Sequence, residues 1–375
     1  MRIIYLMDQM YLHGGAEKIV TLKLNALANK DSNEVSLITI QQGDKDFVYA
    51  LNSKVKTVDL DISYNRTKSF FYPINILKSL LHFVRLKRKL KELDAEVIVS
   101  VSQTPDQFFL PFVRTKTPKV KEFHTSGYAS KQNLQGGLKK KLFNSYEKYD
   151  SLTVLNEDEI QYYPFKNVNV IPNFIEREKR TSRLPEKTRQ KNIIAAGRIA
   201  EVKQFDHLLK AWSRIAHKHS DWKVAIYGDG DVDLLHRLNI EIKNLGLSNI
   251  TLCGATADLA AIMQESSIFA LTSSTECFPM VLLEAMSQGL PIVSYDCPHG
   301  PRNIIDRDSG VLVAKNDVQK LAEALSHFMD NEEERKDKAT AAIQKVKEYS
   351  EANVMGQWET LFANLIDLKK EIKQT

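Results

Sequence analysis

The feature that most constrains this chain is an alternation of short β-branched runs with amphipathic helical stretches along nearly its whole length. This alternation is typical of parallel sheets that are covered by helices on both faces. The pattern predicts two series of strands. The first series is expected at 2–8, 34–40, 55–60, 96–102, 120–125, 151–156 and 168–172, and the second at 192–197, 223–228, 250–254, 268–273, 291–296 and 310–314.

A charged segment without apolar periodicity, 174–191, separates the two series and is predicted to be a linker. A chain of 375 residues with 43% hydrophobic content can bury two cores. The predicted fold class is therefore α/β, with two tandem Rossmann-like doubly wound domains, 1–173 and 192–350, facing a cleft. The last stretch, 351–375, contains an amphipathic helix, and its stripe is expected to pack on another surface, with the N-terminal domain as a candidate. The stripe consists of Val354, Trp358, Leu361, Phe362 and Leu365.

The three cysteines, Cys253, Cys277 and Cys297, are far apart in sequence and odd in number. They predict neither a disulfide framework nor a structural zinc site, and they are consistent with a reducing cytoplasm. The first residues turn polar too early for a signal peptide, and no apolar run approaches the roughly 18 residues of a spanning helix. We therefore expect a cytoplasmic protein.

The net charge is +5, and the positive charge is concentrated in the N-terminal half. Two basic stretches there, 84–93 and 131–149, are interleaved with leucine, phenylalanine and tyrosine. One interpretation is a surface that docks on anionic lipid, and the other is a set of solvated helix faces. No nucleic-acid motif accompanies these charges.

Gly14 and Gly15 follow the first expected strand, and a helix is expected to begin near Ala16. The two glycines allow a close backbone approach to a ligand, and the helix start offers free N–H groups to an anion. The stretch is not G-x-G-x-x-G, and no acidic residue ends the second strand, so a nicotinamide cofactor is not expected. The alternative is a plain strand-to-helix turn.

Arg198 and Lys203 follow the first strand of the second series, next to a helix that is expected to start near Phe205. Two cations there would hold a diphosphate without a metal, and the alternative is a pair of solvated loop charges.

Asp229 and Asp231 have the D-x-D form of some metal sites. We favour a turn in which Asp231 caps the following helix, and we predict no metal and no cofactor.

The segment 276–289, ECFPMVLLEAMSQG, places Glu276 and Glu284 eight residues apart. Pro279 is suited to a first helical turn and Gly289 to a helix end, so a helix is predicted from Met280 to Gln288. Glu276 then lies in the preceding loop and Glu284 inside the helix. Since a carboxylate accepts two hydrogen bonds from adjacent hydroxyls, each glutamate suits a sugar diol. The alternative is a helix-terminus charge for Glu276 and a solvated face for Glu284.

The stretch 273–305 resembles the signature of retaining glycosyltransferases of family 4, which are two-domain GT-B enzymes, and Glu276 and Glu284 match its E-x7-E motif. Further motifs occur in the order of that family. They are GGAE at 14–17, HT at 124–125, VIPNFIE at 170–176, and GRIAEVKQFD at 197–206, where the family has G-R-x(n)-K-G-x-D. The form of 278–302 is similar to a subgroup that builds bacterial surface polysaccharides on lipid carriers.

The resemblance implies roles for single residues. Glu284 would bind the ribose hydroxyls of the donor, and Glu276 would lie near the donor sugar. Arg198 and Lys203 would neutralise the departing diphosphate. His124 would contact the sugar near the reacting carbon, Gly14 and Gly15 would lie under the phosphates or the acceptor, and the backbone at Gly254 would lie near the base. The implied catalytic set is Glu276, His124, Arg198 and Lys203, and the implied donor contacts also include Phe278, Pro279, Met280 and Val281.

The activity that the resemblance implies is retaining, metal-independent transfer of a hexose or N-acetylhexosamine. The donor would be a nucleotide-diphosphate sugar, with UDP as the expected nucleotide, and the acceptor a growing, lipid-linked cell-surface glycan at the inner face of the cytoplasmic membrane. Two alternatives remain, a UDP-sugar 2-epimerase of the same fold and a non-catalytic glycan- or membrane-binding module. Cys277 and Pro279 stand where many relatives have glycine, and Asn303 stands where the subgroup often has glutamate.

Overall fold

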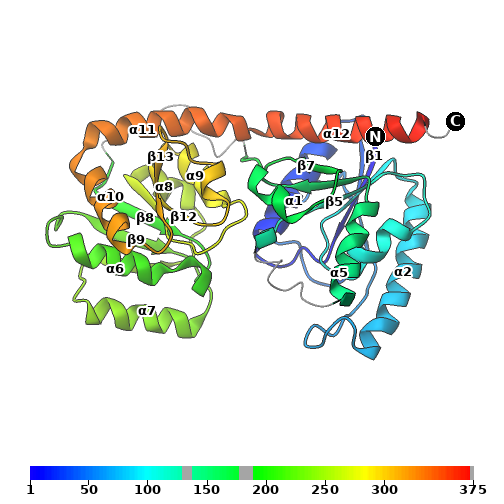
Figure 1. The fold of residues 1–375 in the computed structure, drawn as a ribbon, viewed down its shortest axis with the longest axis horizontal. Helices are drawn as coiled ribbons and strands as arrows, with labels where there is room; N and C mark the ends of the chain where they lie inside the picture. Colours follow the sequence, from blue (N-terminus) through cyan, green and yellow to red (C-terminus); the bar gives the residue numbers. More distant parts are fainter. Residues whose placement is uncertain (129–136, 177–188, 372–375) are drawn as a thin grey trace. The chain divides into compact units, whose positions relative to one another are not determined.

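The computed structural model describes residues 1–128, 137–176 and 189–371. The chain divides into two compact units, which are described one at a time (Figure 1). Unit 1 comprises Met1–Pro172 together with Ala352–Thr375, and unit 2 comprises Asn173–Glu351. The predicted linker 174–191 lies mostly outside the described residues.

Unit 1 is built on a parallel sheet with the strand order β3-β2-β1-β4-β5-β6-β7. Its strands are β1 (Arg2–Met7), β2 (Glu34–Thr39), β3 (Lys56–Asp59), β4 (Val97–Ser100), β5 (Lys119–Glu122), β6 (Ser151–Val154) and β7 (Val168–Val170). The central strands are buried and rich in valine, isoleucine and leucine, as expected for strands that are covered on both faces.

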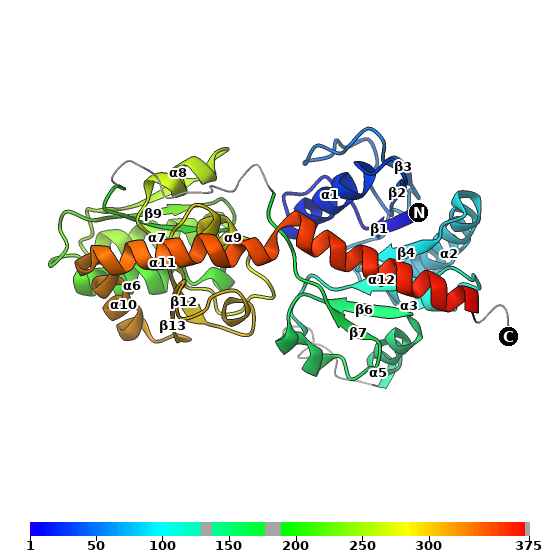
Figure 2. The ribbon, with the colours of Figure 1, turned by 90° about the horizontal axis from the view of Figure 1, so that it is seen from above.

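Helices cover both faces of this sheet (Figure 2). One face carries α2 (Pro73–Leu93), α3 (Asp106–Phe109), and the 3₁₀ turns η1 (Leu110–Phe112) and η2 (Ser145–Lys148), next to α5 (Gly137–Asn144). The other face carries α1 (Gly15–Ala28) and α12 (Glu351–Glu371), which lie side by side. Four of the five residues of the predicted α12 stripe are buried, and Leu361 is partly buried.

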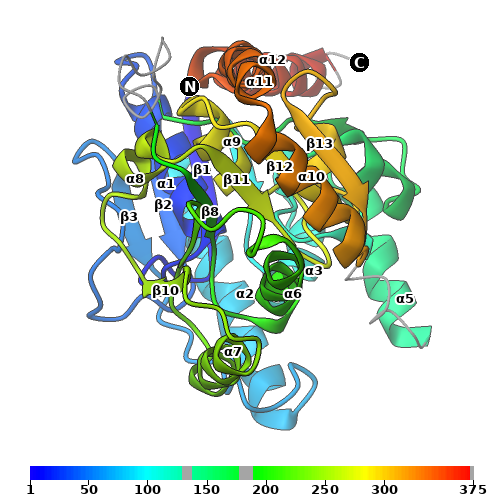
Figure 3. The same ribbon diagram turned by 90° about the vertical axis from the view of Figure 1, so that its left-hand side faces the viewer.

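Unit 2 is built on a second parallel sheet, with the strand order β10-β9-β8-β11-β12-β13. Its strands are β8 (Asn192–Ala196), β9 (Lys223–Tyr227), β10 (Ile250–Gly254), β11 (Ile268–Leu271), β12 (Ile292–Asp296) and β13 (Gly310–Ala314). Helices α6 (Phe205–Ile215), α7 (Val232–Asn244) and α10 (Val318–Asp330) pack on one face, while α8 (Leu259–Glu265), α9 (Met280–Ser287) and α11 (Glu332–Lys345) lie on the other (Figure 3). Buried Trp212 and Trp222 belong to the core between this sheet and α6.

The predicted fold class is confirmed, and each expected strand is present within three residues of its predicted ends. The errors lie mainly at the carboxyl ends. His124 and Thr125, for example, were expected in a strand but follow β5 in a loop. In parallel sheets, ligands bind to the loops that follow the carboxyl ends of the strands, and these polar residues lie in such a loop. Within the described residues, no helix has the length and apolar content that crossing a bilayer requires.

Candidate active site

The strand order of unit 2 creates a switch point between β8 and β11. The chain leaves β8 toward β9 and β10 on one side, and it returns to the other side of β8 as β11. Doubly wound sheets bind ligands in the crevice at the carboxyl ends of such strands. Arg198 and Lys203 follow β8, and Glu276 follows β11, so the topology brings these predicted residues to one edge of the sheet.

Lys203 and Glu276 form an ion pair at this edge. Lys203 Nζ lies 2.6 Å from Glu276 Oε1, and the two side chains are only 19% and 15% exposed. The hydroxyl of Ser273 donates to the same carboxylate oxygen at 2.7 Å. The hydroxyl of Thr272 donates to the Lys203 carbonyl at 2.8 Å and so ties the two loops together. The structure therefore holds an ammonium and a carboxylate in a fixed, largely water-excluded position.

The loop after β8 is shaped to present Lys203. A Cβ added at Gly197 would lie 3.2 Å from Lys203 Cε, so the lysine side chain runs across this glycine. Lys203 ends the 3₁₀ turn η5 (Glu201–Lys203), and Gln204 follows in the left-handed conformation with φ 45°. The family pattern has glycine at the position of Gln204, which matches the backbone that this turn requires.

Backbone hydrogen bonds join the loop of Glu276 to residues 298–300. The Glu276 N–H donates to the Pro298 carbonyl at 2.9 Å, and the His299 N–H donates back to the Glu276 carbonyl at 2.7 Å. A Cβ at Gly300 would lie 2.5 Å from Pro279 Cδ, so this close approach requires glycine. The Asn303 side-chain amide donates to the His299 carbonyl at 2.7 Å, and a glutamate at position 303 has no N–H for this bond.

Helix α9 begins after Pro279, as predicted, and ends at Ser287, one residue before the predicted end. Leu282, Leu283 and Met286 are buried, whereas Glu284 is half-buried on the same helix. Phe278 is buried, and its ring centroid lies 5.6 Å from that of Tyr349. The Phe278 side chain is therefore committed to the interior, and only its backbone remains for the predicted donor contact. Met280 and Val281 are partly exposed on the first turn of α9.

The remaining predicted residues of unit 2 lie on neighbouring loops. Arg198 is exposed, and its guanidinium makes no hydrogen bond or ion pair with the described part of the chain. Gly254 ends β10 with φ 73°.

Asp229 accepts a hydrogen bond from the Ala255 N–H at 3.1 Å, and Asp231 accepts one from the Leu234 N–H at 3.0 Å as the N-cap of α7. The predicted turn-and-cap role of the D-x-D pair is confirmed.

In unit 1, Gly14 is the N-cap of α1, but a carboxylate already lies at this helix start. A Cβ at Gly14 would clash with Glu17 Oε2, and Glu17 Oε1 accepts a hydrogen bond from the Gln9 side chain at 2.8 Å. An anionic ligand at Gly14 and Gly15 would therefore meet Glu17 as well as the free N–H groups. A hydroxyl-bearing ligand suits this site better than a phosphate does, because Glu17 accepts hydrogen bonds.

His124 belongs to a buried charged group that the sequence analysis missed. His124 Nε2 lies 2.8 Å from Glu122 Oε1, and Lys23 Nζ contacts the same carboxylate from α1. Burial alone would raise the pKa of Glu122, but Lys23 and His124 hold it at about 2. Burial lowers the pKa of Lys23, and Glu122 offsets part of that effect. The ring of Trp358 covers Lys23, with Nζ 4.6 Å from its centroid.

A signal for Glu122 was present in the sequence. Glu122 is only two residues before His124 in the sequence, so a carboxylate is available nearby to pair with the imidazole. The partner Lys23 is 99 residues away in sequence and carries no such signal.

Comparisons with known proteins agree with this architecture. The family model described as glycosyl transferases group 1 matches residues 146–345. The chain is 29% identical to an uncharacterized glycosyltransferase of Haemophilus influenzae, over 85% of this chain and 88% of that protein. It is 25% identical to the amylovoran biosynthesis glycosyltransferase AmsD of Erwinia amylovora, over 96% and 99% of the two chains.

Among solved structures, the apo form of the lipopolysaccharide outer core galactosyltransferase WaaB superposes with a TM-score of 0.75. The alignment covers 97% of this chain and all of that one at 18% identity, so it speaks for the fold alone. Since the family model covers more than half of the chain, the protein belongs to the glycosyl transferases group 1 family and is a glycosyltransferase with the GT-B fold.

Proposed function

We propose that the protein is a retaining, metal-independent transferase that moves a hexose or N-acetylhexosamine from a UDP-sugar to a lipid-linked glycan. The observation that carries this proposal is the Lys203–Glu276 pair at the switch point of unit 2. An ammonium held in a largely water-excluded crevice stabilises a diphosphate more strongly than the same charge does in bulk water.

In the proposed step, the bond between the anomeric carbon and the diphosphate oxygen breaks, and its electron pair leaves with UDP. The oxygen of the acceptor hydroxyl forms the new bond to that carbon, and its proton passes to an oxygen of the departing UDP. Lys203 and exposed Arg198 would neutralise the charge that develops on UDP. Glu284 would accept hydrogen bonds from the ribose hydroxyls, and Glu276 from the donor sugar.

Two known proteins support the choice of substrates. A structure of Anabaena HepE in complex with UDP and glucose superposes with a TM-score of 0.75 at 18% identity. A relative from Campylobacter jejuni, 25% identical over 94% of this chain and 96% of its own, is named as an N-acetyl-D-galactosaminyltransferase acting on a PP-undecaprenol-linked glycan. These names favour a UDP-sugar donor and a polyprenyl diphosphate-linked acceptor.

The surface of α2 supports the proposed contact with an anionic membrane. The first part of the helix exposes Ile74, Ile76, Leu77, Leu80, Leu81 and Val84. Lys87, Arg88 and Lys91 are exposed in its last turns. An amphipathic helix with an apolar part and a basic part binds anionic lipid. The second predicted basic stretch, 131–149, lies partly outside the described residues.

Metal independence is proposed because each aspartate of the D-x-D pair already serves a turn or a cap. Lys203 and Arg198 would supply the positive charge that the diphosphate needs. Transfer should therefore be unchanged after treatment with a chelator. A loss of activity that added Mg²⁺ or Mn²⁺ restores would contradict this part of the proposal.

A thermal-shift screen of the full chain against a panel of nucleotide sugars tests the donor class, because a ligand that binds the folded form raises Tm. We expect a rise with UDP and with at least one UDP-sugar, and none with uridine alone. Incubating that UDP-sugar without acceptor separates the proposal from the epimerase alternative. Conversion to the 2-epimer in the absence of acceptor would overturn the proposal.

A further inference from the structure

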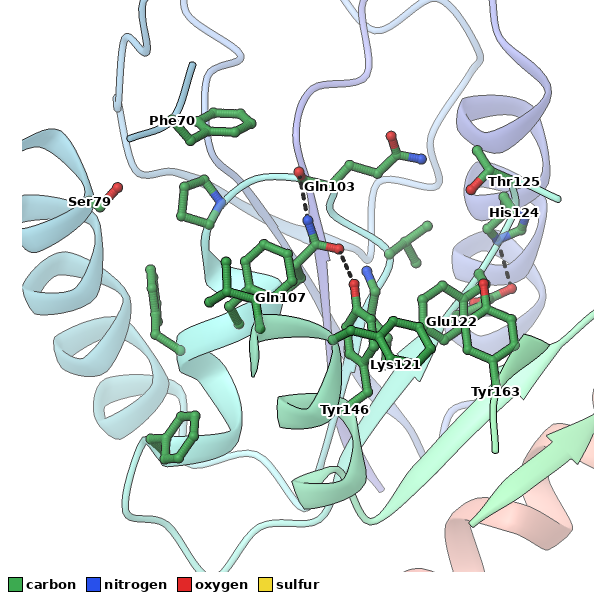
Figure 4. A pocket seen from close by; sticks show the side chains of 18 of the residues that line it. Phe70, Ser79, Gln103, Gln107, Lys121, Glu122, His124, Thr125, Tyr146 and Tyr163 are labelled. Atoms are coloured by element: carbon green, nitrogen blue, oxygen red, sulfur yellow. Dashed lines mark hydrogen bonds and ion pairs between the residues drawn. The ribbon is translucent and has the colours of Figure 1, made fainter. Parts of the chain in front are cut away.

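Unit 1 contains a large aromatic cavity beside His124 (Figure 4). Its volume is about 720 Å³, in the range of sites that take small organic ligands. The cavity extends from the carboxyl ends of β4 and β5 to α2 and α5. Nine of its twenty lining residues are phenylalanine or tyrosine, namely Phe70, Phe71, Phe108, Phe109, Phe112, Phe123, Phe143, Tyr146 and Tyr163.

The polar side chains in the wall are largely matched to partners within the protein. Gln107 donates to the Gln103 carbonyl at 2.8 Å and accepts from the Tyr146 hydroxyl at 2.7 Å, so both ends of its amide are used (Figure 4). Lys121 Nζ donates to the Ser102 carbonyl at 2.5 Å. Glu122 Oε1 is paired with Lys23 and His124, whereas Glu122 Oε2 has no hydrogen-bond partner among the described residues.

This arrangement favours an apolar occupant over a sugar. A sugar ring needs several hydrogen-bond partners, and polar groups that are already paired would have to exchange one partner for another. An apolar chain needs no hydrogen-bond partner, and its burial against each aromatic ring contributes favourable binding free energy. Gln103, His124 and Thr125 gather at one end of the cavity, which gives a ligand with a polar head and an apolar tail a defined direction.

The outer wall of the cavity is also apolar, and it reaches the protein surface. Phe71, Ile76 and Phe112 line the cavity and are also about half exposed. Ile76 belongs to the apolar part of α2, and the Lys148 ammonium lies 5.4 Å from the ring centroid of Phe112. An apolar chain can therefore extend from the cavity to the exposed face of α2, while its polar head stays beside Gln103, His124 and Thr125.

We propose that the aromatic cavity binds the first isoprene units of the polyprenyl diphosphate that carries the acceptor glycan. This assignment rests on the proposed function, since it names a second binding site for the acceptor of the same reaction. Because His124 borders the same cavity, the accepting sugar then lies near the lipid end of the glycan rather than far along it. The substrate class is a short glycan on a polyprenyl diphosphate.

Calorimetric titration of the full chain with geranylgeranyl diphosphate, geranyl diphosphate and inorganic diphosphate tests the proposal in the absence of vesicles. Burial of a CH₂ group favours binding about fourfold, so the longer chain should bind at least about tenfold more tightly than geranyl diphosphate. Equal affinity for the three probes would overturn the proposal.

Two double variants locate the binding site. Ile76→Gln with Phe112→Gln changes cavity residues that are 47% and 56% exposed, so folding should be kept. We expect at least about tenfold weaker binding of geranylgeranyl diphosphate. Leu77→Gln with Leu80→Gln changes two residues of the proposed membrane-contact surface of α2 that are each 62% exposed and do not line the cavity. Since no vesicle is present in this assay, the change should leave binding of geranylgeranyl diphosphate unchanged. Equal loss in both variants would assign the binding to the surface of α2 and contradict the cavity.

Two further measurements on the same samples separate the remaining outcomes. Dioctanoyl phosphatidylglycerol, used below its micellar concentration, tests a membrane lipid as the source of the chain. If it binds as tightly as geranylgeranyl diphosphate with the same dependence on Ile76 and Phe112, the assignment to the carrier is wrong. A thermal shift with UDP reports on the donor site. A normal UDP shift without chain-length dependence rejects the cavity proposal alone, whereas a missing UDP shift rejects the proposed function.

Discussion

The change Glu284→Gln removes one negative charge and tests binding of the donor without a large effect on folding. It is half-buried on α9, beside the buried Leu283 and Ala285, and the conservative change Glu284→Gln keeps its size. A hydrogen bond to a charged group contributes about 1.5–3 kcal/mol, so losing the carboxylate should lower kcat/KM by roughly 10- to 100-fold. The measurement is transfer from the UDP-sugar that the thermal-shift screen selects.

The matched control for this change is Glu323→Gln. Glu323 lies on α10 of the same unit, is exposed, and pairs with Lys320 at 2.8 Å. It should leave kcat/KM unchanged. Equal activity of both variants would show that Glu284 does not contact the donor.

Lys121 provides a pH-dependent test of the buried polar wall in unit 1. Burial lowers its pKa from 10.5 to about 8, and neighbouring carboxylates, Asp106 first, offset part of this effect. The folded state therefore loses this proton near pH 8, and the unfolded state near pH 10.5. Between these values the unfolded state binds more protons, so the Lys121 contribution to stability becomes more favourable as pH rises.

Lys121→Met removes this titration. We expect the free energy of unfolding of the natural protein to rise relative to that of the variant between pH 8 and pH 10, by up to about 3 kcal/mol. Urea unfolding of both proteins at several pH values measures the difference. A difference that is constant over this range would show that Lys121 is not desolvated as the structure indicates.

At the scale of elements, α12 completes unit 1 although it is far away in sequence. Trp358 is fully buried and covers the ammonium of Lys23, which pairs with Glu122. Trp358→Ala should cost about 3–5 kcal/mol of stability, the usual cost of such a truncation, and Trp358→Phe should cost less because an aromatic face remains over Lys23. Calorimetric unfolding measures both effects.

Leu368→Ala is the control on the same helix, since Leu368 is 53% exposed, and it should change stability by less than about 0.5 kcal/mol. If Trp358→Ala costs no more than this control, the stripe of α12 does not stabilise unit 1.

The sequence predicted the elements far better than their contacts. Runs such as RIIYLM and EVSLIT predict a buried strand locally, because short, nearly continuous apolar runs suit strands that are covered on both faces. The position of α9 followed from Pro279 and Gly289 for the same local reason. The aromatic cavity had no such signal. Its rings come from the segment before α2, from α3, η1, α5 and η2, from the residue after β5 and from Tyr163, and their meeting depends on the strand order.

The candidate site divides in the same way. Lys203 and Glu276 were named from motifs, and the structure adds that they touch. Asn303 was unexplained from sequence, and its hydrogen bond to the His299 carbonyl is visible only once residues 298–300 pack against the loop of Glu276. The local sequence pattern predicts the secondary structure around a residue. The contacts of that residue with distant parts of the chain depend on tertiary packing, which the pattern does not give.

At the scale of the whole molecule, the two units hold complementary chemistry. Unit 2 holds the Lys203–Glu276 pair and the E-x7-E helix, which suit a nucleotide-diphosphate sugar. Unit 1 holds His124, the aromatic cavity and the exposed apolar and basic parts of α2, which suit a lipid-linked acceptor. The concentration of positive charge in the N-terminal half of the sequence would favour the proposed contact with anionic lipid.

Calorimetric titration with UDP tests whether Lys203 binds the diphosphate of the donor. We expect the natural protein to bind UDP and Lys203→Ala to weaken binding roughly 10- to 100-fold, because a charge-assisted contact is lost. Lys210→Ala, which removes an exposed lysine of α6 paired with Asp206, should bind as the natural protein does. Unchanged UDP binding by Lys203→Ala would show that Lys203 does not bind the diphosphate.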